Sequence, residues 1–251
     1  MKILITNDDG INAPGLVSAE KIARQLTDDV TIVAPETDQS GVAHSLTLSH
    51  PLRLRKVGEK KFAINGTPTD CTIMGVREIM NEPPDLVLSG VNSGQNIGDD
   101  VIYSGTVAGA IEGALLGIKS IALSQAYNFA EGTRHVKWGT CEALAPEIID
   151  KLMGQTFPEK TLVNVNFPNC DVGEISGTQI TGQGAFNHGL YMEKRHDGRG
   201  FPYYWIKFGR EVPDQQADSD ITALIEKRIS VTPLKLDLTD TQFKDALKGL
   251  F

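Results

Sequence analysis

Two adjacent carboxylates, Asp8 and Asp9, are the side chains in this sequence that most strongly suggest chemistry. They follow a short apolar run at residues 3–5 and precede Gly10. Neighbouring carboxylates repel each other unless a proton or a cation lies between them. An Asp-Asp-Gly turn can also be purely structural, because Asp side chains accept hydrogen bonds from the backbone of a turn. The pair alone therefore leaves two interpretations open, a cation site and an ordinary turn.

Two further polar residues, Ser40 and Asn92, follow other apolar runs in the same way. In a parallel sheet the carboxyl ends of the strands lie along one edge, where ligands bind, so the four side chains would converge there. Carboxylate, hydroxyl and amide oxygens are hard ligands that favour Mg²⁺, Mn²⁺ or Ca²⁺ over Zn²⁺. Taken singly, Ser40 and Asn92 are better explained as turn residues beside glycines. Their convergence with Asp8 and Asp9 is what favours a metal site.

A polar segment with three glycines, residues 89–100, precedes the sequence Ser104-Gly105-Thr106. The segment matches neither the P-loop pattern nor the dinucleotide-binding pattern. Ser104 is a favourable N-cap for the helix that follows, and the free N–H groups of such a first turn can bind phosphate. For an isolated segment, an ordinary capped helix is the better explanation.

The elements that must position these groups alternate between apolar runs and helical patterns. Such alternation predicts βαβ units, and continuously apolar runs are typical of strands covered on both faces. We therefore expect an α/β fold with a doubly wound, mostly parallel sheet and right-handed crossovers. The expected strands are 3–5, 30–34, 62–64 with a preceding run at 52–54, 85–88 ended by Ser89-Gly90, 120–123, 162–167, and 229–232 ended by Pro233; the expected helices are 13–26, 67–80, 104–117, 138–153 and 221–227.

The second half of the chain is less regular than the first. Residues 1–175 are expected to form the core, completed by residues at about 220–235. Residues 173–209 are rich in Gly, Tyr, Phe and charge without a helical period, which indicates long loops or a hairpin. We predict a projecting C-terminal arm at 176–219 and a short amphipathic tail at 236–251.

The net charge of −8 over 251 residues bears on the class of ligand. Binding to duplex nucleic acid requires a basic surface, so this composition argues against it. A small phosphate compound remains compatible, because a bound cation and helix N-termini reverse the potential locally. We expect no nucleic-acid duplex as a partner.

The three cysteines, Cys71, Cys141 and Cys170, are far apart and form no C-x-x-C motif. This spacing argues against a zinc ribbon or a disulfide framework, and an odd number fits a reducing compartment. The most apolar stretch, 111–118, is short and contains Glu112, so we expect no membrane span. A strand pattern begins at once, without a signal-peptide pattern. We therefore expect a cytoplasmic protein.

Long motifs spread over most of the chain match one known family. They are Ile5-Thr6-Asn7-Asp8-Asp9-Gly10-Ile11-Asn12-Ala13-Pro14-Gly15, Val33-Ala34-Pro35 with Ser40-Gly41, His44-Ser45-Leu46-Thr47, Gly66-Thr67-Pro68-Thr69-Asp70-Cys71, the stretch from Pro83 through Ser104-Gly105-Thr106 to Glu112-Gly113, Asn164-Val165-Asn166-Phe167-Pro168, Asp220, and Ser230-Val231-Thr232-Pro233-Leu234. In these motifs the sequence resembles the SurE family, the survival-protein nucleotidases. The similarity runs from residue 3 to about 234, but residues 176–210 and the tail match only loosely.

This resemblance implies a Rossmann-like fold and one divalent cation, Mg²⁺ or Mn²⁺, in each subunit. It implies that the cation ligands are Asp8, Asp9, Ser40 and Asn92, and that the phosphate contacts are Asn96, Ser104, Gly105 and Thr106. Members of the family hydrolyse nucleoside 5′- and 3′-monophosphates, and some also hydrolyse short polyphosphate. The resemblance therefore implies a metal-dependent phosphomonoesterase, and a homodimer or homotetramer in which arm and tail are exchanged between subunits.

For the mechanism, we predict Asp8 as the general base, with Asn96 and Ser104 as further catalytic residues. The motifs bring no His or Lys to this edge, and a carboxylate that binds a metal is a poor covalent nucleophile. The main alternative is a non-catalytic nucleotide-binding regulatory protein, although such a protein would not need two carboxylates. A deacylase would favour zinc with His ligands. A haloacid-dehalogenase-type phosphatase would have D-x-D where this chain has D-D-G.

Overall fold

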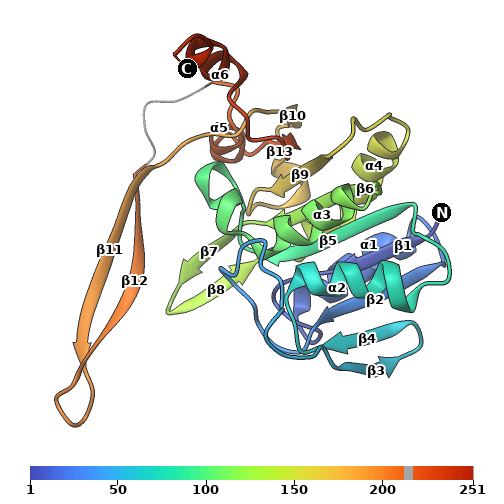
Figure 1. Ribbon diagram of the computed structural model, residues 1–251, viewed down its shortest axis with the longest axis horizontal. Coiled ribbons are helices and arrows are strands. Elements are labelled where there is room, and N and C mark those ends of the chain that lie inside the picture. Colours follow the sequence, from blue (N-terminus) through green and yellow to red (C-terminus); the bar gives the residue numbers. More distant parts are fainter. Residues whose placement is uncertain (212–216, 251) are drawn as a thin grey trace.

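The structure is a computed structural model that describes residues 1–211 and 217–250. Its centre is a nine-stranded sheet (Figure 1). The strands are β1 (Ile3–Thr6), β2 (Val30–Pro35), β3 (Leu54–Gly58), β4 (Lys61–Ile64), β5 (Leu86–Ser93), β6 (Lys119–Gln125), β9 (Thr161–Phe167), β10 (Thr178–Ile180) and β13 (Ile229–Lys235). Their order is β10-β13-β9-β6-β5-β1-β2-β4-β3, and only the pairs β9–β13 and β3–β4 are antiparallel. The predicted α/β fold with a mostly parallel sheet is confirmed.

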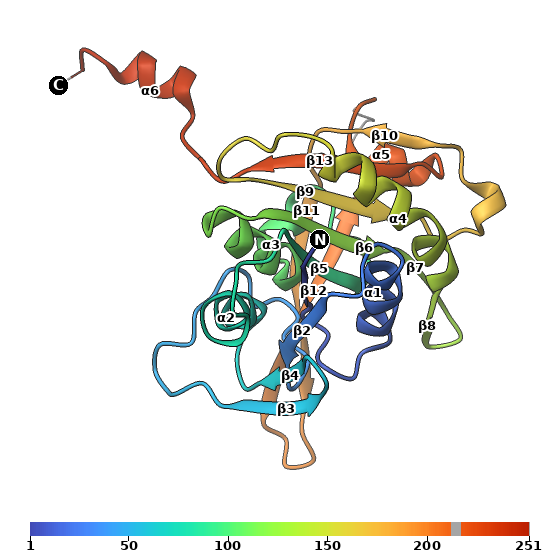
Figure 2. The same cartoon turned by 90° about the vertical axis from the view of Figure 1, so that its right-hand side faces the viewer.

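Helices cover both faces of the sheet, as Figure 2 shows. One face carries α1 (Pro14–Arg24) and α4 (Trp138–Met153), and the other carries α2 (Pro68–Met74) and α3 (Gly105–Leu115). A parallel strand pair needs a crossover connection, and these helices supply it. The layers therefore follow from the predicted alternation of strands and helices.

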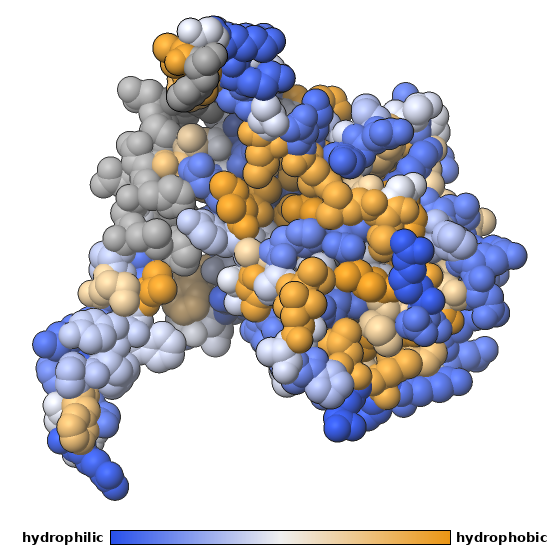
Figure 3. All heavy atoms as spheres, viewed as in Figure 1, coloured by the Kyte–Doolittle hydropathy of each residue, from blue (hydrophilic) through white to orange (hydrophobic). Residues whose placement is uncertain are grey.

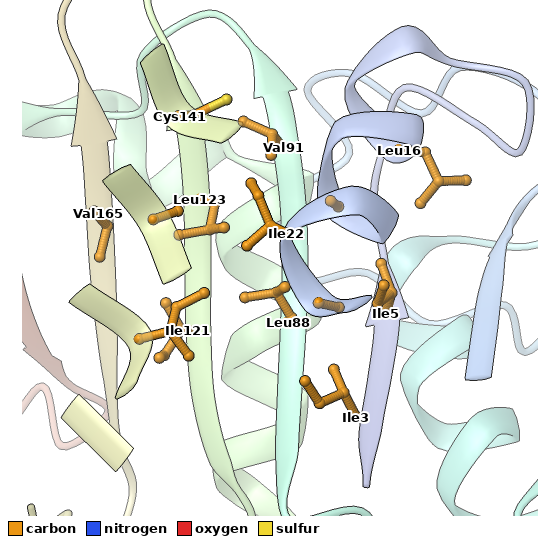
Figure 4. Packing of buried hydrophobic residues seen from close by; sticks show 14 of the residues in the cluster. Ile3, Ile5, Leu16, Ile22, Leu88, Val91, Ile121, Leu123, Cys141 and Val165 are labelled. Atoms are coloured by element: carbon orange, nitrogen blue, oxygen red, sulfur yellow. The ribbon is translucent and has the colours of Figure 1, made fainter. Parts of the chain in front are cut away.

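The core lies between these layers, and β1 contributes to both of its halves. Ile3 and Ile5 belong to the cluster that includes Leu16 and Ile22 of α1, which Figure 4 shows from close by. Leu4, which points to the opposite face, packs in a separate cluster with Cys71 of α2. Since successive side chains alternate between the faces, each must be apolar when both faces are covered. This explains the continuous apolar runs of the sequence.

Helix α3 packs closely on the sheet because glycines face it. A Cβ atom on Gly109 would lie 2.7 Å from the Oγ of Ser89, and one on Gly113 would lie 2.3 Å from the Oγ of Ser120. Real Cβ atoms do not approach other atoms this closely, so no larger residue fits without movement of the helix. Gly105, Gly109 and Gly113 recur every four residues and therefore lie on one face of the helix, which allows this close packing.

Strand β5 was predicted to end at Ser89-Gly90, but it continues to Ser93. The pairing with β6 is irregular between Ser89 and Asn92, and Gly90 has φ +133°. A Cβ atom on Gly90 would lie 2.2 Å from the carbonyl oxygen of Leu123, so glycine is required for the strand to pass its neighbour here. Gly90 therefore permits a bulge within the strand, where a turn was predicted.

Two other element ends also differ from the prediction. Strand β13 continues through Pro233 to Lys235, although Pro233 was expected to end it. β10 pairs only with residues 229–231, so Pro233 lies in an edge segment where its missing N–H is tolerated. The helix expected at 67–80 is α2 up to Met74, continued by a π-helical turn at Gly75–Ile79.

A long hairpin projects from the core, at the left of Figure 1. It consists of β11 (Asn187–His196) and β12 (Pro202–Glu211), which pair in antiparallel register. β10 lies within the range predicted for the arm, yet it joins the central sheet beside β13. The tail contains α6 (Thr241–Leu247), and α5 (Asp220–Ile225) precedes β13. Residues 212–216 of the predicted arm and Phe251 of the predicted tail lie outside the described residues.

Apolar side chains are exposed on both the core and the hairpin. Figure 3 shows hydrophobic residues gathered across the middle of the core on the face viewed there. On β12, Trp205 is 58% and Ile206 is 64% exposed. None of the helices in the described part of the chain is long and apolar enough to cross a membrane.

Candidate active site

A cavity of about 920 Å³ lies at the carboxyl ends of β1, β2 and β5. Six of the residues singled out from the sequence line it: Asp8, Asp9, Ser40, Asn92, Asn96 and Ser104. The other two, Gly105 and Thr106, contact Asp8. The edge-of-sheet argument predicted that Asp8, Asp9, Ser40 and Asn92 would meet here, although Asn92 lies within β5 and not in a loop after it. Their roles as ligands or catalytic groups stay a prediction.

Asp8 is buried, with 4% of its surface exposed, between β1 and the first turn of α3. The hydroxyl of Thr106 donates a hydrogen bond to Oδ1 of Asp8, and a Cβ atom on Gly105 would lie 2.8 Å from the Cβ of Asp8. Burial raises the pKa of the Asp8 carboxyl to about 7, the charge of Asp9 adds to the rise, and the Thr106 hydrogen bond opposes it. In the absence of a cation, the Asp8 carboxyl is therefore partly protonated near neutral pH.

Asp9 lies beside Asp8 and is less deeply buried. Its Oδ2 accepts a hydrogen bond of 3.0 Å from the backbone N–H of Ser93, at the end of β5. Burial raises the pKa of Asp9, and the charge of Asp38 raises it further. The hydrogen bond from Ser93 and the charge of Arg134 lower it. Among the described residues, no Lys, Arg or His forms an ion pair with Asp8 or Asp9. Within the described residues, neither carboxylate is therefore neutralised by a direct ion pair.

Ser40 and Asn92 offer neutral oxygens to the same cavity. The hydroxyl of Ser40 donates to Oδ1 of Asp38 at 2.6 Å, which leaves its lone pairs free. The side-chain amide of Asn92 donates to the carbonyl oxygen of Gly94 at 2.8 Å, so its own carbonyl oxygen is the atom left for a ligand. Across the described residues, no group of three or more His, Cys, Asp or Glu could hold a metal. The donor set that remains, two carboxylates with a hydroxyl and an amide oxygen, suits a hard divalent cation.

Asn96 is held in place by residues of two neighbouring strands. The backbone N–H of Asn96 donates to the side chain of Asn166 at 2.8 Å. The backbone carbonyl oxygen of Asn96 accepts from the side-chain amides of Asn166 at 3.1 Å and Asn164 at 2.8 Å. The side-chain amide of Asn96 donates to Ser124 at 2.9 Å. The amide has a second N–H, so Asn96 can still donate to an anion. Sequence reasoning did not foresee these supporting residues.

Ser104 is the N-cap of α3, as predicted. Its Oγ accepts a hydrogen bond of 3.0 Å from the backbone N–H of Val107, while its own hydroxyl proton remains available as a donor. The first N–H groups of α3 have no partner within the helix, and the helix dipole adds positive potential at this end. An anion beside Asp8 and Asp9 would therefore find donors at the start of α3.

Sequence reasoning missed two segments that line the cavity. One is the hairpin of β7 (Tyr127–Ala130) and β8 (Thr133–Val136), which contributes Tyr127 and Arg134; the other is β12, which contributes Ile206 and Lys207. Glu131 and Gly132 connect β7 and β8 with φ values of +51° and +76°. A two-residue connection of this kind, ending in Gly, is a known hairpin signal. This signal could have revealed the first hairpin.

Comparison with known proteins identifies the family. The family model for survival protein SurE matches residues 3–189. The chain belongs to the SurE family. It is 57% identical over 247 residues to the 5′-nucleotidase SurE of Chelativorans sp. (strain BNC1), with 98% of each chain covered. It is 60% identical over 239 residues to the 5′-nucleotidase SurE of Brucella melitensis biotype 1, with 95% of this chain and 94% of that protein covered.

Solved structures of SurE proteins include a similar fold. The SurE protein from Aquifex aeolicus superposes with a TM-score of 0.85 at 38% identity, covering 100% of this chain and 99% of that chain. The resemblance deduced from the sequence motifs is thus confirmed. The α/β fold that this resemblance implied is confirmed as well.

The contact between Gly105 and Asp8 gives a first prediction. In Gly105→Ala the new methyl group would lie 2.8 Å from the Cβ and 3.1 Å from Oδ2 of Asp8, both of them buried. We expect the free energy of unfolding to fall by about 1–3 kcal/mol, measured by urea denaturation. Gly139→Ala, in α4, is the matched control, since a Cβ atom there meets nothing within 4 Å. Equal stability of the two variants would contradict the close packing described.

The raised pKa of Asp8 gives a second prediction, for protein kept free of metal by a chelator. A carboxyl with a raised pKa holds its proton in the folded state, so its stabilising effect is present at low pH and is lost as pH rises through about 7. Asp8→Asn has no carboxyl to titrate at this position, so it does not lose this stability as pH rises. We expect the variant to gain stability over the unsubstituted protein as pH increases from about 5 to about 8, reaching about 2–4 kcal/mol. Denaturant unfolding at several pH values measures the difference, and a difference that does not change with pH would refute the assignment.

Proposed function

We propose that this SurE family member is a metal-dependent phosphomonoesterase that hydrolyses nucleoside 5′- and 3′-monophosphates to nucleoside and phosphate. The observation that carries the proposal is the position of Asp8 and Asp9, which lie in one cavity with the N-terminus of α3. A site for a cation thereby adjoins a site for an anion. The relatives named 5′-nucleotidase SurE, similar over nearly the whole chain, support hydrolysis of the 5′-monophosphates. Short-chain polyphosphate is proposed as a further substrate, since it has the same terminal phosphoryl group.

The cation of this proposal is one Mg²⁺ or Mn²⁺ in each subunit. Asp8, Asp9, Ser40 and Asn92 would hold it through their oxygen atoms, and two carboxylates balance the charge of one divalent cation. When bound, such a cation polarises a phosphoryl oxygen as a Lewis acid. The raised pKa values of Asp8 and Asp9 support this role, because a cation removes the repulsion that burial strengthens.

The phosphate group would be bound by the N-terminus of α3. The backbone N–H groups of Gly105 and Thr106 and the hydroxyl of Ser104 are the proposed donors, with the side-chain amide of Asn96 from the facing loop. These donors are fixed before substrate arrives, through the capping bond of Ser104 and the asparagine contacts that hold Asn96. Preorganised donors stabilise the charge that develops on the equatorial oxygens during the reaction.

Asp8 is the proposed general base. Its carboxylate lies in the same cavity as the proposed phosphate donors, where it can accept a proton from an attacking water molecule. Thr106, which donates to Oδ1 of Asp8, fixes the orientation of the carboxylate and leaves Oδ2 for the reaction. The non-catalytic alternative does not account for this carboxylate, since a phosphate bound at a helix N-terminus needs no acid beside it.

Assembly and compartment belong to the same proposal. The hairpin of β11 and β12 exposes Trp205 and Ile206, and the tail exposes Leu238 to 93%, which supports burial of these segments in a homodimer or homotetramer. The three cysteines are free and buried, which supports the reducing environment of the cytoplasm.

The proposed reaction is tested by phosphate release from a panel of nucleoside 5′- and 3′-monophosphates and short polyphosphate. We expect release with Mn²⁺ or Mg²⁺, and its loss when a chelator is added, because the carboxylate pair acts with a cation. Folded protein that binds nucleotide but releases no phosphate with any divalent metal would reject the enzyme and favour the regulatory protein.

The separate roles of Asp8 and Asp9 can be tested with Asp8→Asn and Asp9→Asn. We expect Asp8→Asn to lose turnover by about 100-fold or more at saturating Mn²⁺ while calorimetry still detects cation binding, because the base is removed and an oxygen ligand remains. In Asp9→Asn, excess Mn²⁺ should restore part of the turnover, since this residue mainly holds the cation. Near-normal turnover of Asp8→Asn would exclude Asp8 as the base.

A further inference from the structure

The cavity has more negative charge than one divalent cation can balance in the presence of substrate. Asp8 and Asp9 line it, and Asp38 lies close enough to raise the pKa of both. A phosphate monoester adds about two further negative charges near neutral pH. The whole chain carries a net charge of −8 and so gives no general attraction for an anion. A side-chain cation at the cavity wall is therefore needed to complement the N–H groups of α3.

Two basic residues among the described ones line the cavity, Arg134 on β8 and Lys207 on β12. They differ in their partners. Lys207 forms an ion pair with Glu193 of the neighbouring strand, which neutralises much of its charge. Arg134 forms no ion pair in the described part of the chain, and its charge acts on Asp9, whose pKa it lowers. Arg134 is thus the cavity-lining cation whose charge is not already used.

Arg134 is also supported in a defined position. Its guanidinium lies over the ring of Tyr127, 4.8 Å from the ring centroid, and its Nη1 donates a long hydrogen bond of 3.4 Å to the carbonyl oxygen of Ser93. The ring of Tyr127 packs on Gly94, where a Cβ atom would lie 3.1 Å from Cε1. Gly94 in turn accepts the hydrogen bond of Asn92. The stack of arginine, tyrosine and glycine therefore ends beside the last residues of β5, which carry a proposed metal ligand.

This arrangement leaves the N–H groups at the edge of the guanidinium available. When the flat face of a guanidinium rests on an aromatic ring, its N–H donors lie in the guanidinium plane and point outward. Two of these donors match the spacing of two phosphate oxygens. The bond to Ser93 is long and uses a neutral acceptor, so exchange for a charged acceptor is favourable.

We propose that Arg134, on the β7–β8 hairpin, is a substrate-binding residue that contacts the phosphate group directly. The inference rests on the proposed function, in that it assigns a residue to phosphate recognition at the same site. It adds a side-chain cation to the backbone donors of Gly105 and Thr106.

The test uses direct binding of inorganic phosphate to the full-length protein loaded with Mn²⁺, measured by calorimetry, together with the affinity for Mn²⁺ itself. In Arg134→Gln, we expect phosphate affinity to fall about 10- to 100-fold, as for the loss of a charge-assisted bidentate contact. Mn²⁺ affinity should stay the same or rise, since Arg134 opposes a cation at Asp9. Arg134→Lys keeps the positive charge but cannot donate two parallel hydrogen bonds. Its phosphate affinity should lie between those of the unsubstituted protein and Arg134→Gln. Arg77→Gln removes the same charge from an exposed residue that does not line the cavity, and it should bind phosphate as the unsubstituted protein does.

Two results would overturn the inference. One is phosphate affinity of Arg134→Gln within about two-fold of the unsubstituted protein. The other is a parallel loss of Mn²⁺ affinity, which would mean that Arg134 only supports the loop of Asn92 and Gly94. Failure of the proposed function gives a different result, in which the unsubstituted protein with Mn²⁺ binds phosphate but does not release it from nucleotides.

Discussion

The close approach of α3 to the end of β1 is the constraint on which the rest of the site depends. Gly105 permits it, because any Cβ atom at this position would overlap Asp8. The approach buries Asp8, brings Thr106 within hydrogen-bond reach, and directs the free N–H groups of a helix toward a pair of carboxylates. Gly109 and Gly113 extend the same contact along the sheet. The helix thus adds positive potential beside the most negative point of the sheet edge.

Asp8 and Asp9 also connect the segments that form the cavity, Asp8 through its backbone and Asp9 through its carboxylate. The carbonyl oxygen of Asp8 accepts a hydrogen bond from the N–H of Gln39, in the loop after β2. The side chain of Asp9 accepts from Ser93 at the end of β5. Burial of these charges opposes folding in the metal-free protein, as the raised pKa values indicate. A divalent cation would remove this cost, so cation binding and the order of the three loops are coupled.

Local sequence signals were sufficient for the fold and for the position of the carboxylates. Apolar runs identify strands, their carboxyl ends share one edge, and Asp8 and Asp9 follow a run directly, so their location needs no tertiary information. The cap at Ser104 is likewise local. The family resemblance added Asn96, whose role no local pattern indicates, and the assignment of all these residues to catalysis or binding stays a prediction.

Contacts between distant segments could not be predicted in this way. Asn166 lies 70 residues from Asn96, and nothing in either local sequence indicates that they pair. Gly90 was interpreted as the end of β5, because its role in passing Leu123 depends on the neighbouring strand. Arg134 lies on a hairpin of two four-residue strands with exposed side chains, which gives no periodic apolar pattern. Its place in the cavity depends on the packing of Tyr127 against Gly94.

The central claim is that Asp8 and Asp9 hold a divalent cation beside a phosphate site at the N-terminus of α3. The most direct measurement is a crystal structure of the protein with Mn²⁺ and phosphate, in which anomalous scattering locates the metal. The account predicts a manganese peak about 2.0–2.6 Å from carboxylate oxygens of both residues, with phosphate within hydrogen-bond reach of Gly105 and Thr106. A cavity without manganese at these carboxylates, or manganese bound only at other acidic residues, would contradict it.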